Sequence, residues 1–249
     1  MSRLLRYTDL HCHILPGLDD GASTWDEAMD MARNAVKAGA ARVVATPHVM
    51  RGAYMPRPGD MREKVAELQA RLKAAGISLT VVPGAEVFLA SGTAREYRAG
   101  RLQTIGDSDY ILVELPPLSF PKYAWAEIRA LLHAGAGVII AHPERNIEIC
   151  QDRAILKELI GHGVFFQLNA GSLTGAFGRM ARDCAEFLVE ENLVHFLGSD
   201  AHSGLPAALS AVGADISCAL ERLMDLSPSG PAVLEQIEAR VGRLLSGKL

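Results

Sequence analysis

Imidazole and carboxylate side chains stand at the ends of several apolar segments of this chain. Nine of them could bind metal ions: His11, His13, Asp20, His48, Glu86, Glu114, His142, Asp200 and His202. Neutral nitrogen and anionic oxygen together hold borderline-hard divalent cations and neutralise their charge. Because such groups are costly to bury unless they are paired or bound to cations, the pattern predicts a metal-dependent active site.

The segment Asp9-Leu10-His11-Cys12-His13 is the most compact part of this pattern. The period-two geometry of a strand places His11 and His13 on one face, where two imidazoles can chelate one metal. Taken alone, the pair could equally be two buried histidines with ordinary hydrogen bonds. Polar residues that end the other apolar runs make the metal site the better interpretation.

Arg145 lies three residues after His142 and could bind a phosphoryl group. Its planar guanidinium is suited to two phosphoryl oxygens, whereas an isolated arginine usually forms only an exposed ion pair. Its place beside the predicted metals favours phosphate binding. The segment 49–60 contains two further basic residues, Arg51 and Arg57. This segment is either a substrate-binding lid or an ordinary solvated loop.

The other histidines and the cysteines are interpreted as structural. His133 falls in a helical pattern, His162 at a helix end and His195 early in a strand. The cysteines form no C-x-x-C pair, which indicates buried, unreactive thiols: Cys12, Cys150, Cys184 and Cys218. A cysteine-dependent phosphatase is excluded, because the position six residues after Cys12 is Leu18 and not arginine.

Seven apolar runs rich in β-branched residues alternate with helical patterns. The runs lie near 4–11, 42–46, 79–86, 110–115, 137–142, 164–169 and 194–199. Helices are predicted after the first run, where Thr24 and Glu27 form a capping box, and near 59–75, 122–134, 151–161, 178–191, 206–224 and 230–246. This alternation predicts parallel strands joined by helices.

The distribution of the candidate ligands distinguishes an open sheet from a barrel. An open sheet gathers its site at one crevice, whereas a barrel collects side chains from the carboxyl ends of nearly all its strands. Six of the seven predicted strands end in a candidate ligand, and the sixth strand ends in Asn169. We therefore predict an α/β fold with a closed barrel of about seven strands.

Composition limits the remaining classes. The 249 residues are 49% hydrophobic and 22% charged with a net charge of −4, which is typical of a single globular domain covering residues 1–249. No basic stripe predicts nucleic-acid binding. We see neither a signal peptide nor an apolar run long enough for membrane insertion, so we expect a cytoplasmic protein. Exposed strand-end loops could also support a homo-oligomer.

Several motifs together resemble a known superfamily. Asp9-Leu10-His11-Cys12-His13-Ile14-Leu15-Pro16-Gly17-Leu18-Asp19-Asp20-Gly21 is similar to the opening signature of the PHP (polymerase and histidinol phosphatase) superfamily. Further matching segments follow in the family's order: Thr46-Pro47-His48, Gly84-Ala85-Glu86, Glu114-Leu115-Pro116, His142-Pro143-Glu144-Arg145-Asn146, Asn169-Ala170-Gly171-Ser172-Leu173 and Asp200-Ala201-His202. Within the superfamily, the chain most resembles the manganese-dependent protein tyrosine phosphatases of bacterial capsule and exopolysaccharide loci.

The resemblance implies a distorted TIM-like (β/α)₇ barrel of PHP type with three divalent metal ions, manganese being expected and iron or zinc being alternatives. It implies one ion on His11, His13, Glu86 and Asp200, a second on Glu86, Glu114 and His142, and a third on Asp20, His48 and His202. A hydroxide between the metals would attack phosphorus in line. We expect Arg145, Asp200 and His202 to take part in catalysis.

The leading hypothesis is a phosphatase that acts on the phosphotyrosine tail of a bacterial tyrosine autokinase. The alternatives are a small-molecule phosphomonoesterase of the histidinol phosphate type and a catalytically weak regulatory module. A nuclease is disfavoured by the negative net charge. The regulatory alternative arises from one departure, because the family's second phosphate-binding arginine is absent from residues 203–208. Phosphate would then rest on Arg145, the metals and Arg51 or Arg57.

Overall fold

The computed structural model describes residues 6–203 and 216–249. Its strands are β1 (Tyr7–Cys12), β2 (Ala40–Ala45), β3 (His48–Val49), β4 (Thr80–Pro83), β5 (Glu86–Phe88), β6 (Tyr110–Glu114), β7 (Gly137–Ala141), β8 (Phe165–Asn169) and β9 (Phe196–Gly198). Its helices are α1 (Trp25–Lys37), α2 (Pro58–Ala74), α3 (Thr93–Arg98), α4 (Lys122–His133), the 3₁₀ helix η1 (Pro143–Arg145), α5 (Ile147–Gln151), α6 (Ala154–Gly161), α7 (Ala170–Leu173), α8 (Arg179–Glu190), α9 (Ile216–Leu226) and α10 (Ala232–Leu245).

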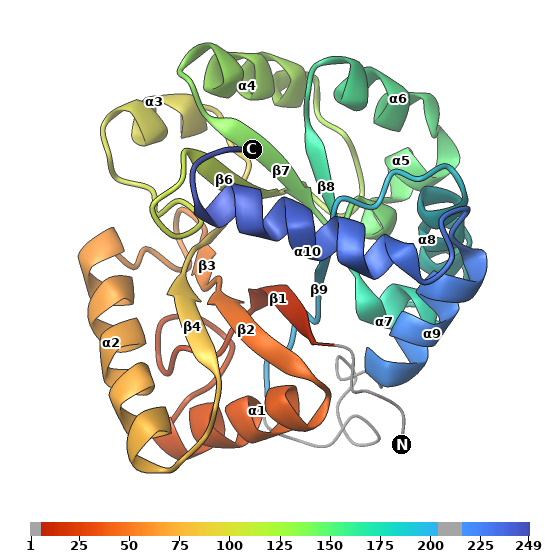
Figure 1. Ribbon diagram of the computed structural model, residues 1–249. Helices are drawn as coiled ribbons and strands as arrows, with labels where there is room; N and C mark the ends of the chain where they lie inside the picture. The colour runs from red at the N-terminus through yellow and green to blue at the C-terminus, as the bar shows by residue number, and fades with distance from the viewer. Residues whose placement is uncertain (1–5, 204–215) are drawn as a thin grey trace.

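The strands form a curled, all-parallel barrel surrounded by helices (Figure 1). One sheet has the order β1-β2-β4, and the other has the order β3-β5-β6-β7-β8-β9. The barrel closes between its first and last strands, where Cys12 pairs with Ala201 and the amide of Asp200 donates to the carbonyl of His11 at 2.8 Å. The structure thus confirms the predicted α/β barrel.

The third predicted run, 79–86, is divided between β4 and β5, and the second run, 42–46, is followed by the short strand β3, which was not predicted. β2 stops before Thr46-Pro47, and β4 stops before Gly84-Ala85. Pro47 has no amide hydrogen to donate, and a Cβ at Gly84 would lie 2.7 Å from Cγ1 of Val44, so neither position continues a regular ladder. The two breaks lie side by side, because the amide of Glu86 donates to the carbonyl of Pro47 at 3.1 Å.

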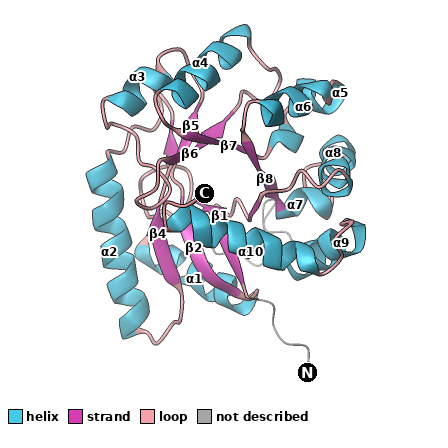
Figure 2. Ribbon diagram, turned by 45° about the horizontal axis from the view of Figure 1, so that its top comes forward, coloured by secondary structure: helices cyan, strands magenta, loops and turns pink. Residues whose placement is uncertain are grey.

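Helices cover the outside of the barrel, and α10 crosses its amino end (Figures 1 and 2). Glu238 on α10 accepts hydrogen bonds from the amide and the hydroxyl of Thr8, and Arg240 donates to the carbonyl of His195 at 3.0 Å. These contacts hold the beginnings of β1 and β9. The opposite, carboxyl end of the barrel is therefore the end available for a site.

The predicted start of α1 is confirmed, with one difference in its cap. Thr24 Oγ1 accepts from the amide of Glu27 at 3.2 Å, while the Glu27 carboxylate accepts from the amide of Ser23 at 2.6 Å and not from that of Thr24. Ala28, Met31 and Ala32 are the buried face of the helix. Burying a methionine side chain contributes about 1.5–3 kcal/mol, so this face fixes α1 against the barrel.

Most predicted helices agree with the structure to within a few residues. The helix predicted over 151–161 is α6, which begins at Ala154, and the short helix α5 before it was not predicted. The helices α3 and α7 were not predicted, because four to six residues are too few to show a helical period. The first part of the helix predicted over 206–224, residues 4 and 5 of the first run, and most of the arginine-free segment 203–208 lie outside the described residues.

Within the described parts of the chain, no helix is both long and apolar enough to cross a bilayer.

Candidate metal centre

All nine predicted ligands lie at the carboxyl end of the barrel. They belong to its strands or to the segments that follow them: His11 in β1, His13 directly after β1, Asp20 in the loop that follows, His48 in β3, Glu86 in β5, Glu114 in β6, His142 after β7, and Asp200 and His202 after β9. Parallel strands present their carboxyl ends at one edge, so residues far apart in sequence meet there. The described residues contain three groups of side chains whose ligand atoms lie within 4.8 Å of one another.

The deepest group contains His11, His13, Glu86 and Asp200, all of them buried. His11 Nε2 lies 3.1 Å from Glu86 Oε2 and 3.5 Å from Asp200 Oδ1. His13 Nε2 lies 3.4 Å from each of the same two oxygens. Two imidazole nitrogens and two carboxylate oxygens thus converge on one point, which is a donor set that suits a divalent transition metal.

A second group lies nearer the surface and contains His13, Asp20, His48 and His202. Asp20 Oδ1 lies 3.7 Å from His48 Nε2 and 3.5 Å from His202 Nε2. The side chain of Asp20 is 52% exposed, whereas that of His202 is 24% exposed. This group therefore forms the mouth of the site, and His13 links it to the deeper group.

The third group contains His48, Glu86 and Glu114. His48 Nδ1 lies 3.0 Å from Glu86 Oε2 and 3.8 Å from Glu114 Oε2. His142 contacts the other carboxylate oxygen of Glu86: its Nε2 lies 2.9 Å from Oε1. This grouping differs from the set of Glu86, Glu114 and His142 that the family resemblance implied, because His48 takes the nearer position.

Unpaired buried atoms test whether a cation fits this centre. Among the residues described, His48 Nδ1, Glu86 Oε2 and Glu114 Oε2 are buried without a hydrogen-bond partner. A buried polar atom without a partner costs about 1–3 kcal/mol, and a carboxylate costs more. These three atoms are the facing donors of the third group, and a divalent cation would satisfy all of them at once.

Opposed charges inside the centre shift its titration. Burial alone would lower the pKa of the His11 imidazole, but the carboxylates of Glu86 and Asp200 outweigh burial and raise it to about 9. Burial would raise the pKa of Glu86 and of Asp200, yet the surrounding imidazoles, His11 foremost, hold both well below their usual range. Glu114 is the exception, because burial and the charge of Glu86 raise its pKa. Anionic oxygens are thus concentrated in the deepest group.

Two residues that orient the ligands were missed by the sequence analysis. Asp19 Oδ2 lies 2.7 Å from His13 Nδ1, and the same carboxylate accepts from the amides of Gly21 and His48. Gln167 Oε1 lies 2.9 Å from His11 Nδ1. Each contact leaves the Nε2 atom of its histidine facing the metal centre. Partners of this kind fix the tautomer and orientation of ligating imidazoles.

Arg145 reaches the centre from η1. Its Nη1 donates to Asp200 Oδ2, and Asn169 Nδ2 donates to the same oxygen at 2.9 Å. The guanidinium lies 4.3 Å from the centre of the Phe177 ring. The side chain is 35% exposed, so one edge of the guanidinium is open to a ligand that enters the mouth of the site.

Glu144, next to Arg145, is completely buried and fixes this segment. Its Oε1 accepts from the amide of Asn169 at 2.9 Å and from Ser172 Oγ at 2.8 Å. Burial raises the pKa of this carboxyl group. Glu144 thereby joins η1 to the end of β8, and it positions Arg145 and Asn169 relative to each other.

Backbone strain coincides with two of the predicted ligands. His142 has a φ of 29° and Asp200 a φ of 55°, a region that non-glycine residues adopt at a cost of about 1–3 kcal/mol. Strain of this size is retained where the surrounding structure determines the conformation. Here it turns both side chains inward directly after β7 and β9.

The remaining histidines lie outside the three groups of described residues. His133 bonds to the carbonyl of Arg129 at the end of α4, and His162 packs edge-on against Trp125. The prediction of buried thiols is correct for Cys12 and Cys184, but Cys150 is only partly buried and Cys218 is exposed, so for these two it was wrong. Cys218 lies on the outward side of α9, where the apolar periodicity does not require burial.

Comparisons with known proteins agree with this arrangement. A family profile described as capsular polysaccharide synthesis, CpsB/CapC, matches residues 7–207. The tyrosine-protein phosphatase YwqE of Bacillus subtilis is 40% identical over 195 residues, which are 78% of this chain and 77% of that protein. The putative tyrosine-protein phosphatase CapC of Staphylococcus aureus is 33% identical over 78% of this chain and 76% of its own length.

A solved structure is also closely similar. It comes from the crystal structures of YwqE from Bacillus subtilis and CpsB from Streptococcus pneumoniae, described as metal-dependent tyrosine phosphatases. The TM-score is 0.89 at 34% identity, and the match covers 97% of this chain and 95% of that one. The chain belongs to the CpsB/CapC family of capsular polysaccharide synthesis.

Proposed function

We propose that this protein is a metal-dependent protein tyrosine phosphatase that hydrolyses phosphotyrosine on a bacterial tyrosine autokinase of capsule or exopolysaccharide synthesis. One observation carries the proposal: three groups of nitrogen and oxygen donors are linked pairwise, each pair sharing one residue (His13, His48 or Glu86), and Arg145 contacts the same cluster. The relatives named tyrosine-protein phosphatases support the substrate class. The proposed compartment is the cytoplasm.

The three donor groups would hold three divalent ions. The proposed ligands are His11, His13, Glu86 and Asp200 for the deepest ion, Asp20, His48 and His202 with His13 for the outer ion, and Glu114 with Glu86, His48 and His142 for the third. The donors are nitrogen and oxygen without a thiolate, which suits manganese, with iron or zinc as alternatives. When bound, such ions neutralise phosphoryl charge and lower the pKa of water.

The chain's own residues bind and orient the substrate. Arg145 is proposed to receive two phosphoryl oxygens through its planar fork, supported from behind by Phe177. Asp200 holds that fork beside the centre, and Asn169 donates to the same oxygen of Asp200. Tyr54 stacks on His48 at the mouth, with ring centroids 6.0 Å apart and an interplanar angle of 15°. An aromatic side chain at this position offers a face to the phenyl ring of the substrate.

The decisive experiment compares two substrates with one preparation of the protein. Manganese-loaded and chelator-treated samples are assayed for phosphate release from a phosphotyrosyl peptide and from histidinol phosphate. We expect turnover of the peptide that disappears on chelation and returns with manganese. Turnover of histidinol phosphate alone would contradict the proposal and support a small-molecule phosphomonoesterase. Silence on both substrates would support a regulatory module.

The variant Arg145→Ala tests the phosphate-binding role. Loss of one preorganised charged donor is expected to lower kcat/KM by about 10²–10³-fold. Arg33→Ala is the matched control, because Arg33 is an exposed arginine on α1 that pairs only with Asp30 among the described residues. Equal activity of the two variants would remove Arg145 from the proposed mechanism.

A further inference from the structure

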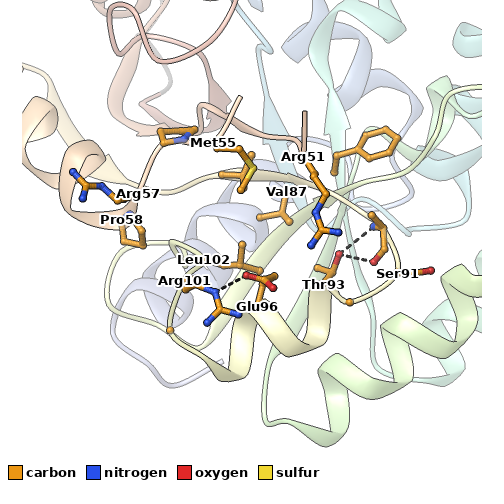
Figure 3. Close-up of a pocket in the computed structure, with 16 residues that line it drawn as sticks. Arg51, Met55, Arg57, Pro58, Val87, Ser91, Thr93, Glu96, Arg101 and Leu102 are labelled. Carbon is orange, nitrogen blue, oxygen red and sulfur yellow. Dashed lines mark hydrogen bonds and ion pairs between the residues drawn. The ribbon is translucent and has the colours of Figure 1, made fainter. Parts of the chain in front are cut away.

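A largely apolar pocket lies beside the metal centre, on the outer side of β3 and β5 (Figure 3). Its volume is about 310 Å³. Val49, Val87 and Leu102 are among its apolar lining, and Met55 extends over it from the loop between β3 and α2. Met55 is 61% exposed, which is unusual for a large apolar side chain. A flexible thioether at the rim of an open pocket is suited to contact with varied apolar groups.

The pocket is built on the same strand pair as the metal centre. His48 pairs with Glu86 in the register of β3 and β5, and the next pair is Val49 with Val87. Successive side chains of a strand point to opposite faces, so the first pair turns to the metals and the second pair turns to the pocket. The pocket and the metal centre therefore lie on opposite faces of the same two strands, and residues that line them are direct neighbours in sequence.

Positive charge surrounds this apolar surface. The lining contains Arg51, Arg57 and Arg101 but only one carboxylate, Glu96. Arg57 is bound to Asp60 through two hydrogen bonds, and Arg101 Nε donates to Glu96 at 2.5 Å. Arg51 has no hydrogen bond or ion pair with any described residue, and Figure 3 shows its side chain directed into the pocket near Thr93.

The charge of Arg51 contributes to the lowered pKa of Glu96, after the stronger effect of Arg101, but the guanidinium forms no hydrogen bond or ion pair with it. Such an arginine at the edge of an apolar pocket favours an occupant that carries both a carboxylate and an apolar group. A peptide chain provides both on neighbouring residues. A bound phosphotyrosine would also hold such a chain at the mouth of the centre, so its flanking residues reach the pocket without a separate binding event.

We propose that this pocket docks the stretch of substrate chain next to the phosphotyrosine, with an apolar side chain against Val87 and Leu102 and an acidic side chain on Arg51. The proposal rests on the phosphotyrosine phosphatase function proposed above. It makes Arg51 a specificity residue that is separate from the metal ligands and from Arg145, in place of the phosphate-binding role that the sequence analysis considered for it, because Arg51 lines the apolar pocket. Selection among phosphotyrosines would then depend on the charge of the residues that flank the phosphotyrosine.

Charge reversal tests the docking of the chain. Two phosphotyrosyl peptides are compared, one with leucine and glutamate in the flank and one with lysine in place of the glutamate. p-Nitrophenyl phosphate, which has no chain, serves as the third substrate. We expect Arg51→Glu to raise KM for the acidic peptide roughly fivefold or more, to lower KM for the lysine peptide, and to leave p-nitrophenyl phosphate unchanged. Arg33→Glu on α1 is the matched control and should alter none of the three.

A binding measurement separates failure of docking from failure of the phosphatase function. The same two peptides, with the phosphate replaced by a non-hydrolysable phosphonate, are titrated into manganese-loaded protein and followed by fluorescence anisotropy. A fivefold or greater preference for the acidic peptide that Arg51→Glu reverses supports docking, even if no substrate is hydrolysed. Equal binding of both peptides by the original protein and by Arg51→Glu overturns the proposal, whatever the turnover.

Two further outcomes also overturn it. If Arg51→Glu impairs p-nitrophenyl phosphate as strongly as the acidic peptide, Arg51 acts on the phosphate and not on the flanking chain. If Arg51→Glu instead changes the oligomeric state in sedimentation while peptide binding is unaffected, the pocket receives a second copy of this chain. Met55→Gln provides an independent check, because replacement of this exposed apolar side chain should weaken both peptides and spare p-nitrophenyl phosphate.

Discussion

The substitution Asp19→Asn probes how strongly a residue that touches no metal controls the metal centre. The carboxylate of Asp19 is fully buried as a side chain and accepts from three donors, namely the amide of Gly21, the amide of His48 and the His13 ring. Burial would raise its pKa, but the hydrogen bond from His13 outweighs burial and lowers it, so the group is an anion at neutral pH. Asparagine has the same shape but only one accepting atom.

The magnitude follows from this count of donors. If the amide oxygen takes the place of Oδ2 beside His13, the amide nitrogen faces the N–H of Gly21, and one buried donor loses its partner at a cost of about 1–3 kcal/mol. The other orientation faces two donors and is worse. Loss of a carboxylate behind a ligating histidine typically weakens metal binding 10–100-fold, or about 1.4–2.7 kcal/mol. The first figure is a loss of folding stability, and the second is a loss of metal affinity.

The assay is a manganese titration against a competing chelator, with bound metal counted by atomic absorption. Asp19→Asn is expected to bind its manganese 10–100-fold more weakly than the original protein. Asp30→Asn on α1 is the matched control, since Asp30 is exposed and pairs with Arg33. Manganese affinity of Asp19→Asn equal to that of the control would refute the role assigned to Asp19.

Three further predictions concern stability and packing. Chelation should lower Tm by roughly 5–10 °C in calorimetry, since an ion present at 100 times its Kd contributes about 2.7 kcal/mol; an unchanged Tm would show that no ion was bound. Gly198→Ala should cost about 1–3 kcal/mol in urea unfolding and weaken metal binding, because its Cβ would lie 2.5 Å from Cβ of His11 and from Nε2 of Gln167. Burial, and after it the charge of Arg240, lowers the pKa of His195 to about 4, whereas the unfolded chain takes up this proton near pH 6.5. The free energy of unfolding should therefore fall by about 3 kcal/mol between pH 6.5 and 4. The variant His195→Asn, which keeps an acceptor for the amide of Phe166, should lack this part of the decline.

The barrel and its ligand-bearing edge could be predicted because both depend on local sequence. A polar residue directly after an apolar run marks the carboxyl end of a buried strand, and parallel strands bring these ends together. That reasoning placed His48, Glu86 and His142 correctly at one edge. The grouping of His48 with Glu86 and Glu114 could not be predicted, since it depends on the side-chain torsion angles of these residues.

The residues that orient the ligands were harder to identify. Asp19 and Asp20 are adjacent and chemically identical, and only the path of the loop decides that one points inward to His13 while the other points to the mouth. Gln167 did leave a signal, because a glutamine inside an apolar strand, two residues before Asn169, lies on the same face as that residue. The breaks at Pro47 and Gly84 were likewise visible as residues that interrupt a ladder.

The closing seam of the barrel has a consequence for the order in which the protein acquires its activity during synthesis. The seam joins Asp9 to Ser199, which are separated by 190 residues in sequence, and the deepest metal group takes ligands from both sides of it. A nascent chain whose synthesis has not passed β9 contains His11 and His13 but neither Asp200 nor His202. Such a chain lacks one of the four donors of the deepest group and one of the four donors of the outer group, so a partly synthesised or truncated copy completes neither donor set.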